Sequence, residues 1–363
     1  MLQFHNADRP ASLTSREELT RFLTTKRNAT ERLTVDAIRK LSAPDKDAYD
    51  RERFMHLSGG IVISTPHLQT TKKLLTKAFV QNMGRNSGHH GVMLSGDSTL
   101  GKTTIAKSLM QYVHSQYNRQ FPDYAQHGKL PVVFVEVPVA STPKLLMRNF
   151  ADFLGLSVRT GESARDIQVR VVQALKQAGT QLVVIDELHN LLGSRDGNTQ
   201  TVDALKSLHN DLPATFLYAG IDIAQNGLLN GTARGAQLSG RFHVLELSRL
   251  DIDIAEQADA WEELIDAFEA GLPLANHGAG TLRKLSPYLH ERTGGSIGSL
   301  GRLITGAAVD AITDGNPADE RITKARLDAQ LLDHAAESGR LDRKRSQARR
   351  RTANLIPRKK KAS

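Results

Sequence analysis

The segment Gly91–Lys107, with the sequence GVMLSGDSTLGKTTIAK, constrains the fold of this chain more than any other stretch. An apolar run ends at Leu94, a loop with the spacing G-x-x-x-x-G-K-T follows, and a helical pattern begins after it. This order of strand, glycine-bounded loop and helix is typical of a phosphate-binding loop. The segment therefore predicts a nucleotide site at the end of a strand.

The loop carries the groups that a triphosphate needs. Gly96 and Gly101 let the backbone turn tightly enough for successive N–H groups to point at the β- and γ-phosphates. Lys102 neutralises phosphate charge, and the hydroxyl of Thr103 is placed to bind Mg²⁺. We predict that ATP contacts a continuous run of loop residues, namely Gly96, Asp97, Ser98, Thr99, Leu100, Gly101, Lys102, Thr103 and Thr104.

A second motif, QLVVIDELHN at residues 181–190, completes the predicted site. The apolar run from Leu182 to Ile185 fits a strand that is buried on both faces of a parallel sheet. Asp186, at the end of this strand, is placed to orient the Mg²⁺ shell, and Glu187 to polarise an attacking water. The two motifs together predict hydrolysis of a nucleoside triphosphate.

Composition limits the class of protein. The chain has 363 residues, enough for two domains with separate cores, and its lack of cysteine excludes disulfides and thiol chemistry. It contains no apolar run of membrane-spanning length, and its N-terminus lacks the apolar region of a signal peptide. We therefore expect a cytoplasmic protein without a membrane partner.

The order of patterns predicts a parallel α/β sheet flanked by helices, followed by a small all-helical domain and a disordered basic tail. The predicted divisions are a helical arm (1–50), an α/β nucleotide-binding domain (51–250), a helical lid (251–338) and the tail (339–363). Within them, a helix is expected from Thr34 to about Pro44. A mobile polar loop is expected at residues 193–201, before a helix at 202–210.

The sequence resembles the AAA+ ATPases, and more narrowly the transposition regulators of the TniB/TnsC type, which are relatives of the Mu B protein. The phosphate loop is shared by many ATPases, whereas other matching stretches are narrower. These are VVIDELHNLL (183–192), LKSLHN ending at Asn210, Ala219–Gly220, QLSGRF (237–242), Thr65–Pro66 and GGSIG (294–298). The resemblance covers about residues 50–310.

The resemblance implies an ATP- and Mg²⁺-dependent oligomer, a ring or a filament, that assembles on double-stranded DNA and recruits or activates a transposase. Arg241, at the matching R-F position, is by this resemblance the arginine finger that acts on a neighbouring subunit's nucleotide. The alternative for Arg241 is a surface or salt-bridged arginine. Residues before the loop often cover the adenine in AAA+ proteins, so Ile61, Val62 and Ile63 are candidates for that contact or for a plain core strand.

Three further residues have open roles. Family members place a hydroxyl or amide sensor after the glycine of the fourth strand, whereas here Gly220 is followed by Ile221 and Asp222, so Asp222 is the candidate. Arg302 is the candidate for the second sensor, with a structural or DNA-facing role as its alternative. His189 either links the γ-phosphate site to DNA or a neighbour, or it makes a structural hydrogen bond.

The basic tail supports nucleic-acid binding without any resemblance. The net charge of +9 resides in this tail, because eleven Lys and Arg residues but one acid follow residue 339. Such a tail neutralises phosphates, so we expect DNA binding that weakens steeply with salt. A solubilising or protein-binding tail is the alternative. The residues assigned to DNA are Lys344, Arg345, Arg349, Arg350, Arg351, Lys359, Lys360 and Lys361.

The sequence thus predicts an AAA+ ATPase that marks target DNA for a transposase. Two alternative functions would use the same nucleotide site. One is a nucleotide-switched signalling or defence scaffold, for which DNA is incidental. The other is a replication ATPase that loads a helicase.

Overall fold

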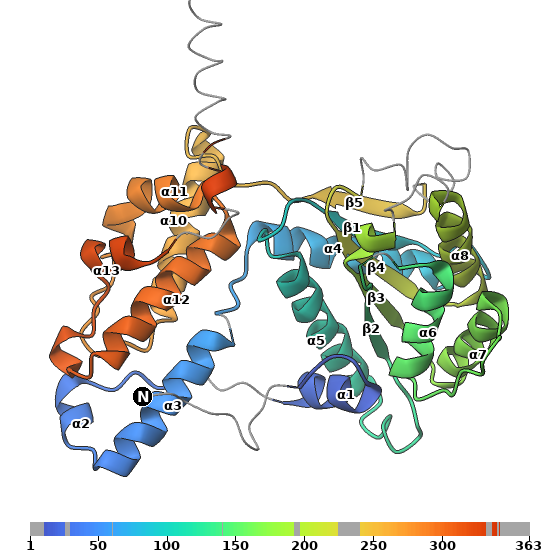
Figure 1. Ribbon diagram of the computed structural model, residues 1–363, viewed down its shortest axis with the longest axis horizontal. Helices are drawn as coiled ribbons and strands as arrows, with labels where there is room; N and C mark the ends of the chain where they lie inside the picture. The colour runs from blue at the N-terminus through green and yellow to red at the C-terminus, as the bar shows by residue number, and fades with distance from the viewer. Residues whose placement is uncertain are drawn as a thin grey trace, which may run out of the picture. The chain divides into compact units, whose positions relative to one another are not determined.

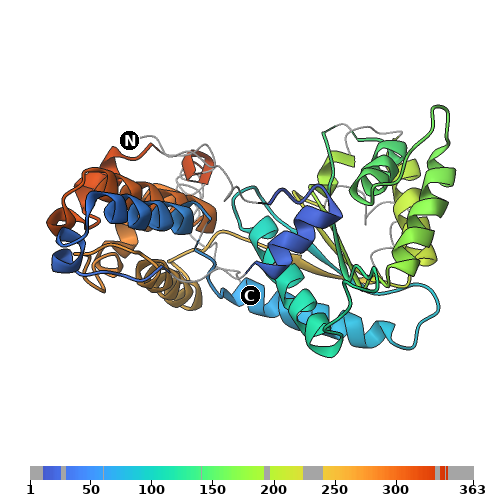
Figure 2. The same cartoon turned by 90° about the horizontal axis from the view of Figure 1, so that it is seen from below.

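The computed structural model of the protein describes residues 11–25, 30–59, 61–139, 141–191, 197–223, 240–331, 336–339 and 341, with the backbone alone at 197–202. The chain divides into two compact units, which Figures 1 and 2 show from two directions. One, here the α/β unit, comprises Phe4–Arg27 and Ser64–Ser248. The other, the helical unit, comprises Met1–Gln3, Asn28–Ile63 and Arg249–Ser363.

The α/β unit is built on a parallel five-stranded sheet in the order β2-β3-β4-β1-β5. The side chains of β1, β3 and β4 are buried along their whole length, as expected for central parallel strands that are covered on both faces. The predicted parallel P-loop sheet is therefore confirmed. The strands are β1 (Gly91–Ser95), β2 (Val132–Glu136), β3 (Leu182–Asp186), β4 (Thr215–Gly220) and β5 (Phe242–Glu246).

Helices cover both faces of this sheet (Figure 1). The helices on one face are α1 (Arg16–Thr24), α4 (Pro66–Asn82) and α5 (Lys102–Gln120). Those on the other are α6 (Pro143–Phe153), α7 (Ala164–Gln177) and α8 (Gly197–Asp211). Local sequence explains where several begin, because Thr65, Thr142 and Ser163 accept backbone N–H bonds as N-caps. α8 begins at Gly197, so the loop prediction is wrong for residues 197–201.

The parallel arrangement brings the predicted site motifs to one edge of the sheet. In a parallel sheet the carboxyl ends of all strands meet at the same edge, where ligands bind. The register pairs Ser95 with Gly220 and Glu136 with Asp186. The phosphate loop, the Asp186–Glu187 pair and the turn after β4 therefore all leave the sheet at its carboxyl edge.

The helical unit packs around the fully buried Trp261. Its helices are α2 (Val35–Arg39), α3 (Ala43–Ser58), α10 (Ala255–Ala270), α11 (Ser286–Thr293), α12 (Ile297–Thr313) and α13 (Lys324–Ala329), with 3₁₀ turns η2 (Arg283–Leu285) and η3 (Pro317–Asp319). Ile61 and Ile63 pack against the same core, and no strand forms there among the described residues. Within the part of the chain that is described, no helix is both long and apolar enough to span a membrane.

A buried ion network ties α3 into the helical unit. The Arg53 guanidinium is fully buried, donates to the Glu320 carboxylate at 2.6 Å and also bonds Asp50. Such a network is destabilising to break, because removing one partner leaves an uncompensated buried charge. The residues predicted as an N-terminal arm are thus divided between the units, and the boundary expected at residue 50 falls inside α3.

Candidate nucleotide site

The phosphate loop follows β1 with glycines at its tight points. Gly96 has a φ of +149°, and a Cβ there would lie 2.6 Å from the backbone oxygen of Leu247. Gly101, with a φ of +86°, precedes the first residue of α5 in a left-handed conformation that favours glycine. Both glycine positions predicted from the loop spacing are therefore required by the backbone itself.

Lys102 folds back into this loop. Its Nζ donates to the backbone oxygens of Gly96 at 2.8 Å and Asp97 at 2.6 Å, and the residue is buried. Burial lowers the pKa of Lys102, and the negative charges of nearby carboxylates, Glu187 and Asp186 foremost, oppose this shift. Among the described residues, two backbone carbonyls accept hydrogen bonds from this buried ammonium. It can exchange them for phosphate oxygens, which are stronger acceptors.

Thr103 and Asp186 meet across α5 and β3. The Thr103 hydroxyl donates to Asp186 Oδ2 at 2.7 Å, and the other carboxylate oxygen accepts the backbone N–H of Glu187 at 2.9 Å. The pair thus offers a hydroxyl oxygen and a carboxylate oxygen, 83 residues apart in sequence, at one point. Oxygen donors of this kind fit Mg²⁺, which uses few protein ligands beside phosphates and waters.

Glu187 leaves the strand in an unusual conformation. Its φ of +55° is left-handed, which is rare for a residue with a side chain and marks local strain where the chain turns from β3 into η1 (Leu188–Leu191). The side chain is partly exposed, and one carboxylate oxygen lies 3.3 Å from Nδ1 of His189. The turn itself is held by the Asn190 side chain, which donates to the backbone oxygen of Val137 at 2.8 Å.

The end of β4 lies against the same turn. A Cβ added to Gly220 would lie 3.1 Å from the backbone nitrogen of His189, so glycine allows the two segments to approach closely. The backbone N–H of Ile221 then donates to Nδ1 of His189 at 3.3 Å. Asp222 follows with a left-handed φ of +47° and contributes to the negative charge that Lys102 faces.

Arg241 lies at the opposite edge of the sheet. It immediately precedes β5, whose first residue pairs with Gly91 at the start of β1. Its guanidinium donates to Asn210 Oδ1 at 2.7 Å, at the end of α8. The structure therefore does not bring Arg241 to the phosphate loop of its own chain. It does join two stretches of the sequence that carried the resemblance, LKSLHN and QLSGRF.

His209, beside Asn210, is buried in an aromatic cluster at this edge. Its ring stacks on Phe216 with centroids 4.1 Å apart and meets Phe242 edge-on at 4.9 Å. Neither ring nitrogen has a hydrogen-bond partner among the described residues. Burial lowers the pKa of His209 from 6.5 to about 3, with a smaller contribution from the Arg241 charge.

Replacing His209 with Phe is expected to reduce the loss of unfolding free energy that the protein shows as the pH falls. Below pH 6.5 the unfolded chain binds a proton at His209 that the folded chain excludes down to about pH 3. The free energy of unfolding therefore falls as pH drops through this window, by about 1.4 kcal/mol per pH unit for one proton. Urea unfolding of the full chain at several pH values measures the slope. The exposed His127→Phe serves as control, and an unchanged slope in His209→Phe would contradict the assignment.

The remaining predicted residues lie elsewhere. Arg302 is exposed on α12 of the helical unit. All eight tail residues assigned to DNA lie outside the described residues. Sequence reasoning did not find Asn210 as the partner of Arg241 or Ile221 as the partner of His189, since both contacts are made only in the folded chain.

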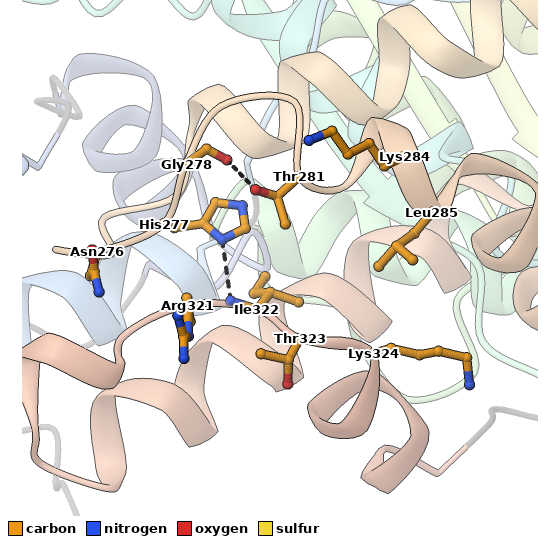
Figure 3. Close-up of a pocket in the computed structure, with 10 residues that line it drawn as sticks. All are labelled: Asn276, His277, Gly278, Thr281, Lys284, Leu285, Arg321, Ile322, Thr323 and Lys324. Atoms are coloured by element: carbon orange, nitrogen blue, oxygen red, sulfur yellow. Dashed lines mark hydrogen bonds between the residues drawn. The ribbon is translucent and has the colours of Figure 1, made fainter.

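A cavity of about 490 Å³ is lined by residues of the helical unit alone (Figure 3). Lys284, Arg321 and Lys324 contribute cations to its lining, which contains no carboxylate among the described residues. His277 forms part of its wall, with Nε2 bonded to buried Glu269 at 2.9 Å and Nδ1 accepting the N–H of Ile322. Lys324 is already paired with Asp328 at 2.8 Å. Neither the phosphate loop nor the Asp186–Glu187 pair lines this cavity.

A comparison with known families decides the affiliation. The sequence model of the family described as Bacterial TniB protein matches residues 53–252. The chain belongs to the TniB family. The matched TniB range contains the phosphate loop, the Asp186–Glu187 pair and Arg241. A search of curated proteins finds no match for this TniB protein.

Solved structures establish the fold of this TniB protein. The Aeropyrum pernix ORC1 protein in complex with DNA is 16% identical, with a TM-score of 0.56 over 84% of this chain and 72% of that one. The A. pernix ORC2 protein in its ADPNP–ADP complexes is 16% identical, with a TM-score of 0.57 over 75% and 70%. Cdc6p from Pyrobaculum aerophilum is 16% identical, with a TM-score of 0.51 over 72% and 66%. The fold is that of AAA+ P-loop ATPases.

Proposed function

We propose that this TniB-family protein is a Mg²⁺-dependent ATPase that assembles on double-stranded DNA and recruits or activates a transposase. The observation that carries the proposal is the convergence of Lys102, Thr103, Asp186 and Glu187 at the carboxyl edge of an AAA+ sheet. Membership of the TniB family supports the connection to transposition.

Each residue has a distinct part in the proposed hydrolysis. The loop N–H groups and Lys102 bind the phosphates, since Lys102 exchanges its two carbonyl partners for phosphate oxygens. Thr103 and Asp186 would hold Mg²⁺, which when bound neutralises charge on the β- and γ-phosphates. Glu187, a partly exposed carboxylate whose negative charge acts on Lys102, accepts the proton of the attacking water.

The location of Arg241 supports an oligomer with nucleotide at subunit interfaces. Arg241 and the phosphate loop lie at opposite ends of β1 and β5, each a strand of five residues. At a rise of about 3.3 Å per residue they are separated by roughly 16 Å, beyond the reach of an arginine side chain. Arg241 can therefore assist hydrolysis only at the nucleotide of a neighbouring subunit, as arginine fingers do in trans.

DNA binding is assigned to the assembled ATPase body together with the basic tail. The tail has eleven Lys and Arg residues against one acid and so accounts for all of the net positive charge, whereas the rest of the chain is close to neutral. Contacts between such a tail and phosphates release counterions, so the tail alone gives salt-sensitive binding without sequence preference. ATP-dependent assembly adds a contribution that responds to nucleotide, and this response separates a DNA-marking ATPase from a scaffold for which DNA is incidental.

The test is fluorescence-anisotropy binding of a random-sequence duplex by the full chain with ATP, ADP or no nucleotide, across a salt series. The matched variant is the full chain with its eight assigned tail cations changed to Gln. We expect ATP and Mg²⁺ to tighten binding about tenfold or more in both proteins, whereas salt sensitivity falls in the variant. Binding that ignores nucleotide and is lost with the tail charges would overturn the proposal in favour of the scaffold. ATP-dependent loading of a replicative helicase, without stimulation of a co-encoded transposase, would favour the helicase loader.

A further inference from the structure

The ring of His189 lies between the catalytic carboxylate proposed above and the end of β4. Its Nδ1 atom is 3.3 Å from Glu187 Oε2 and also 3.3 Å from the backbone nitrogen of Ile221. Both neighbours therefore compete for one nitrogen atom. The ring is about one quarter exposed, so it is neither a fully solvated side chain nor a sealed core histidine.

The two contacts cannot both be hydrogen bonds of a neutral ring. When Nδ1 carries its lone pair, it accepts the Ile221 N–H and presents no proton to the carboxylate. When Nδ1 carries a proton, it donates to Glu187 and cannot accept from Ile221. The structure shows the hydrogen bond from Ile221 to Nδ1. A hydrogen bond from Nδ1 to Glu187 would therefore form only when the bond from Ile221 is broken.

Contacts of the neighbouring backbone restrict movement of the His189 ring away from Glu187 and Ile221. The Asn190 side chain donates to the backbone oxygen of Val137 at 2.8 Å, and the Asn190 backbone N–H donates to the backbone oxygen of Glu187 at 2.9 Å. On the other side, Gly220 approaches so closely that a Cβ there would lie 3.1 Å from the backbone nitrogen of His189 and 2.9 Å from the Ile223 side chain. A shift at the end of β4 is therefore transmitted to the His189 backbone and ring.

We infer that His189 is a positioning residue for Glu187, and that it couples the orientation of this carboxylate to the end of β4. In the hydrolysis-competent arrangement Nδ1–H donates to Glu187 and aims it at the attacking water. When Ile221 N–H takes Nδ1 instead, Glu187 loses its orienting bond. The inference rests on the proposed ATPase function and adds the means by which the residues after β4, including Asp222, influence the catalytic base.

Two substitutions separate positioning from packing. His189→Leu keeps the bulk of the side chain but removes the nitrogen. His189→Asn retains a short amide that can donate to Glu187 from a position close to that of Nδ1. The matched control is His114→Leu, a buried histidine of α5 that bonds the Tyr124 hydroxyl at 2.6 Å. All variants are tested as the full chain.

We expect His189→Leu to lower kcat about tenfold or more, with nucleotide Kd within about threefold of the wild type, because only orientation is lost. His189→Asn should retain most of the activity, and His114→Leu should leave kcat within about twofold. His189→Leu is then combined with Glu187→Gln, and the hydrolysis rate of this double variant is measured in single turnover with radiolabelled ATP. If His189 acts through Glu187, the second substitution changes the residual rate less than about twofold there.

Additive losses in the double variant, or parallel losses of kcat, nucleotide affinity and thermal midpoint, would overturn the inference and leave His189 a structural residue. Equal activity of His189→Leu and the wild type would overturn it as well. These outcomes are distinct from failure of the proposed function, which would appear as a wild-type protein without ATP turnover.

Discussion

Replacing Glu187 with Gln is expected to lower the ATP turnover of this protein by about 100-fold or more, while ATP binding stays within about threefold of the wild type. The amide is nearly isosteric with the carboxylate but cannot take the proton of the attacking water. Phosphate binding depends on the loop and on Lys102, whose contacts within the loop do not involve Glu187. Phosphate release and the fluorescence of a labelled ATP analogue measure the two effects separately.

The sheet offers a matched control for Glu187. Glu136 ends the neighbouring strand β2, is exposed and pairs in register with Asp186. Glu136→Gln removes a carboxylate from the same edge of the sheet but not from the proposed position of the base, so turnover should stay within about twofold. Stalled Glu187→Gln protein should also remain assembled on DNA for longer. Undiminished turnover in Glu187→Gln would show that another group activates the water.

Much of the α/β unit could be predicted because its signals are local. The apolar runs before the phosphate loop and before Asp186 correspond to β1 and β3, and the glycine positions of the phosphate loop follow from its spacing. The contact between Thr103 and Asp186 could be anticipated because parallel strands all end at one edge. Local pattern and topology together therefore indicated the convergence of residues 83 positions apart.

The helical unit shows where such reasoning fails. The sequence predicted one helix from Thr34 to about Pro44, but α2 ends at Arg39 and Pro44 lies in the first turn of α3. Proline fits a first turn, where its missing N–H costs nothing, so it marked a start and not an end. The helix is then fixed by the bond of Arg53 to Glu320, 267 residues away, which no local pattern encodes.

The contacts of Arg241 and His189 were missed for the same reason. The Asn210 side chain that holds Arg241 and the Ile221 N–H that competes for His189 come from separate elements. The sequence indicated that LKSLHN and QLSGRF belong together only through their joint resemblance to one family. Their physical connection is a contact at the amino edge of the sheet, made by α8 and the residue before β5.

Replacing Lys102 with Ala is expected to weaken ATP binding about 100-fold or more. The ammonium exchanges two carbonyl contacts for charge-assisted bonds to phosphate oxygens, each worth about 1.5–3 kcal/mol. Losing two such bonds corresponds to at least about two decades in Kd, at about 1.4 kcal/mol per decade. Equilibrium binding of a labelled ATP analogue measures the loss. Lys107→Ala, on the same helix, should stay within about threefold, and full-affinity binding by Lys102→Ala would exclude Lys102 from the phosphate site.

A mixture of Lys102→Ala and Arg241→Ala chains tests whether these residues act on one nucleotide from two subunits. Lys102→Ala chains retain Arg241 but stay largely free of ATP at concentrations well below their raised Kd. Arg241→Ala chains bind ATP but lack the finger, so each variant alone should be nearly inactive under these conditions. Where the two meet, an interface with intact Arg241 on one side and intact Lys102 on the other restores a complete site. For random mixing at equal amounts, about a quarter of interfaces are complete, so turnover should reach a comparable fraction of the wild-type rate. If Arg241 were only a surface residue paired with Asn210, Arg241→Ala alone would remain active. Adding Lys102→Ala chains would then lower the turnover per total protein and restore nothing.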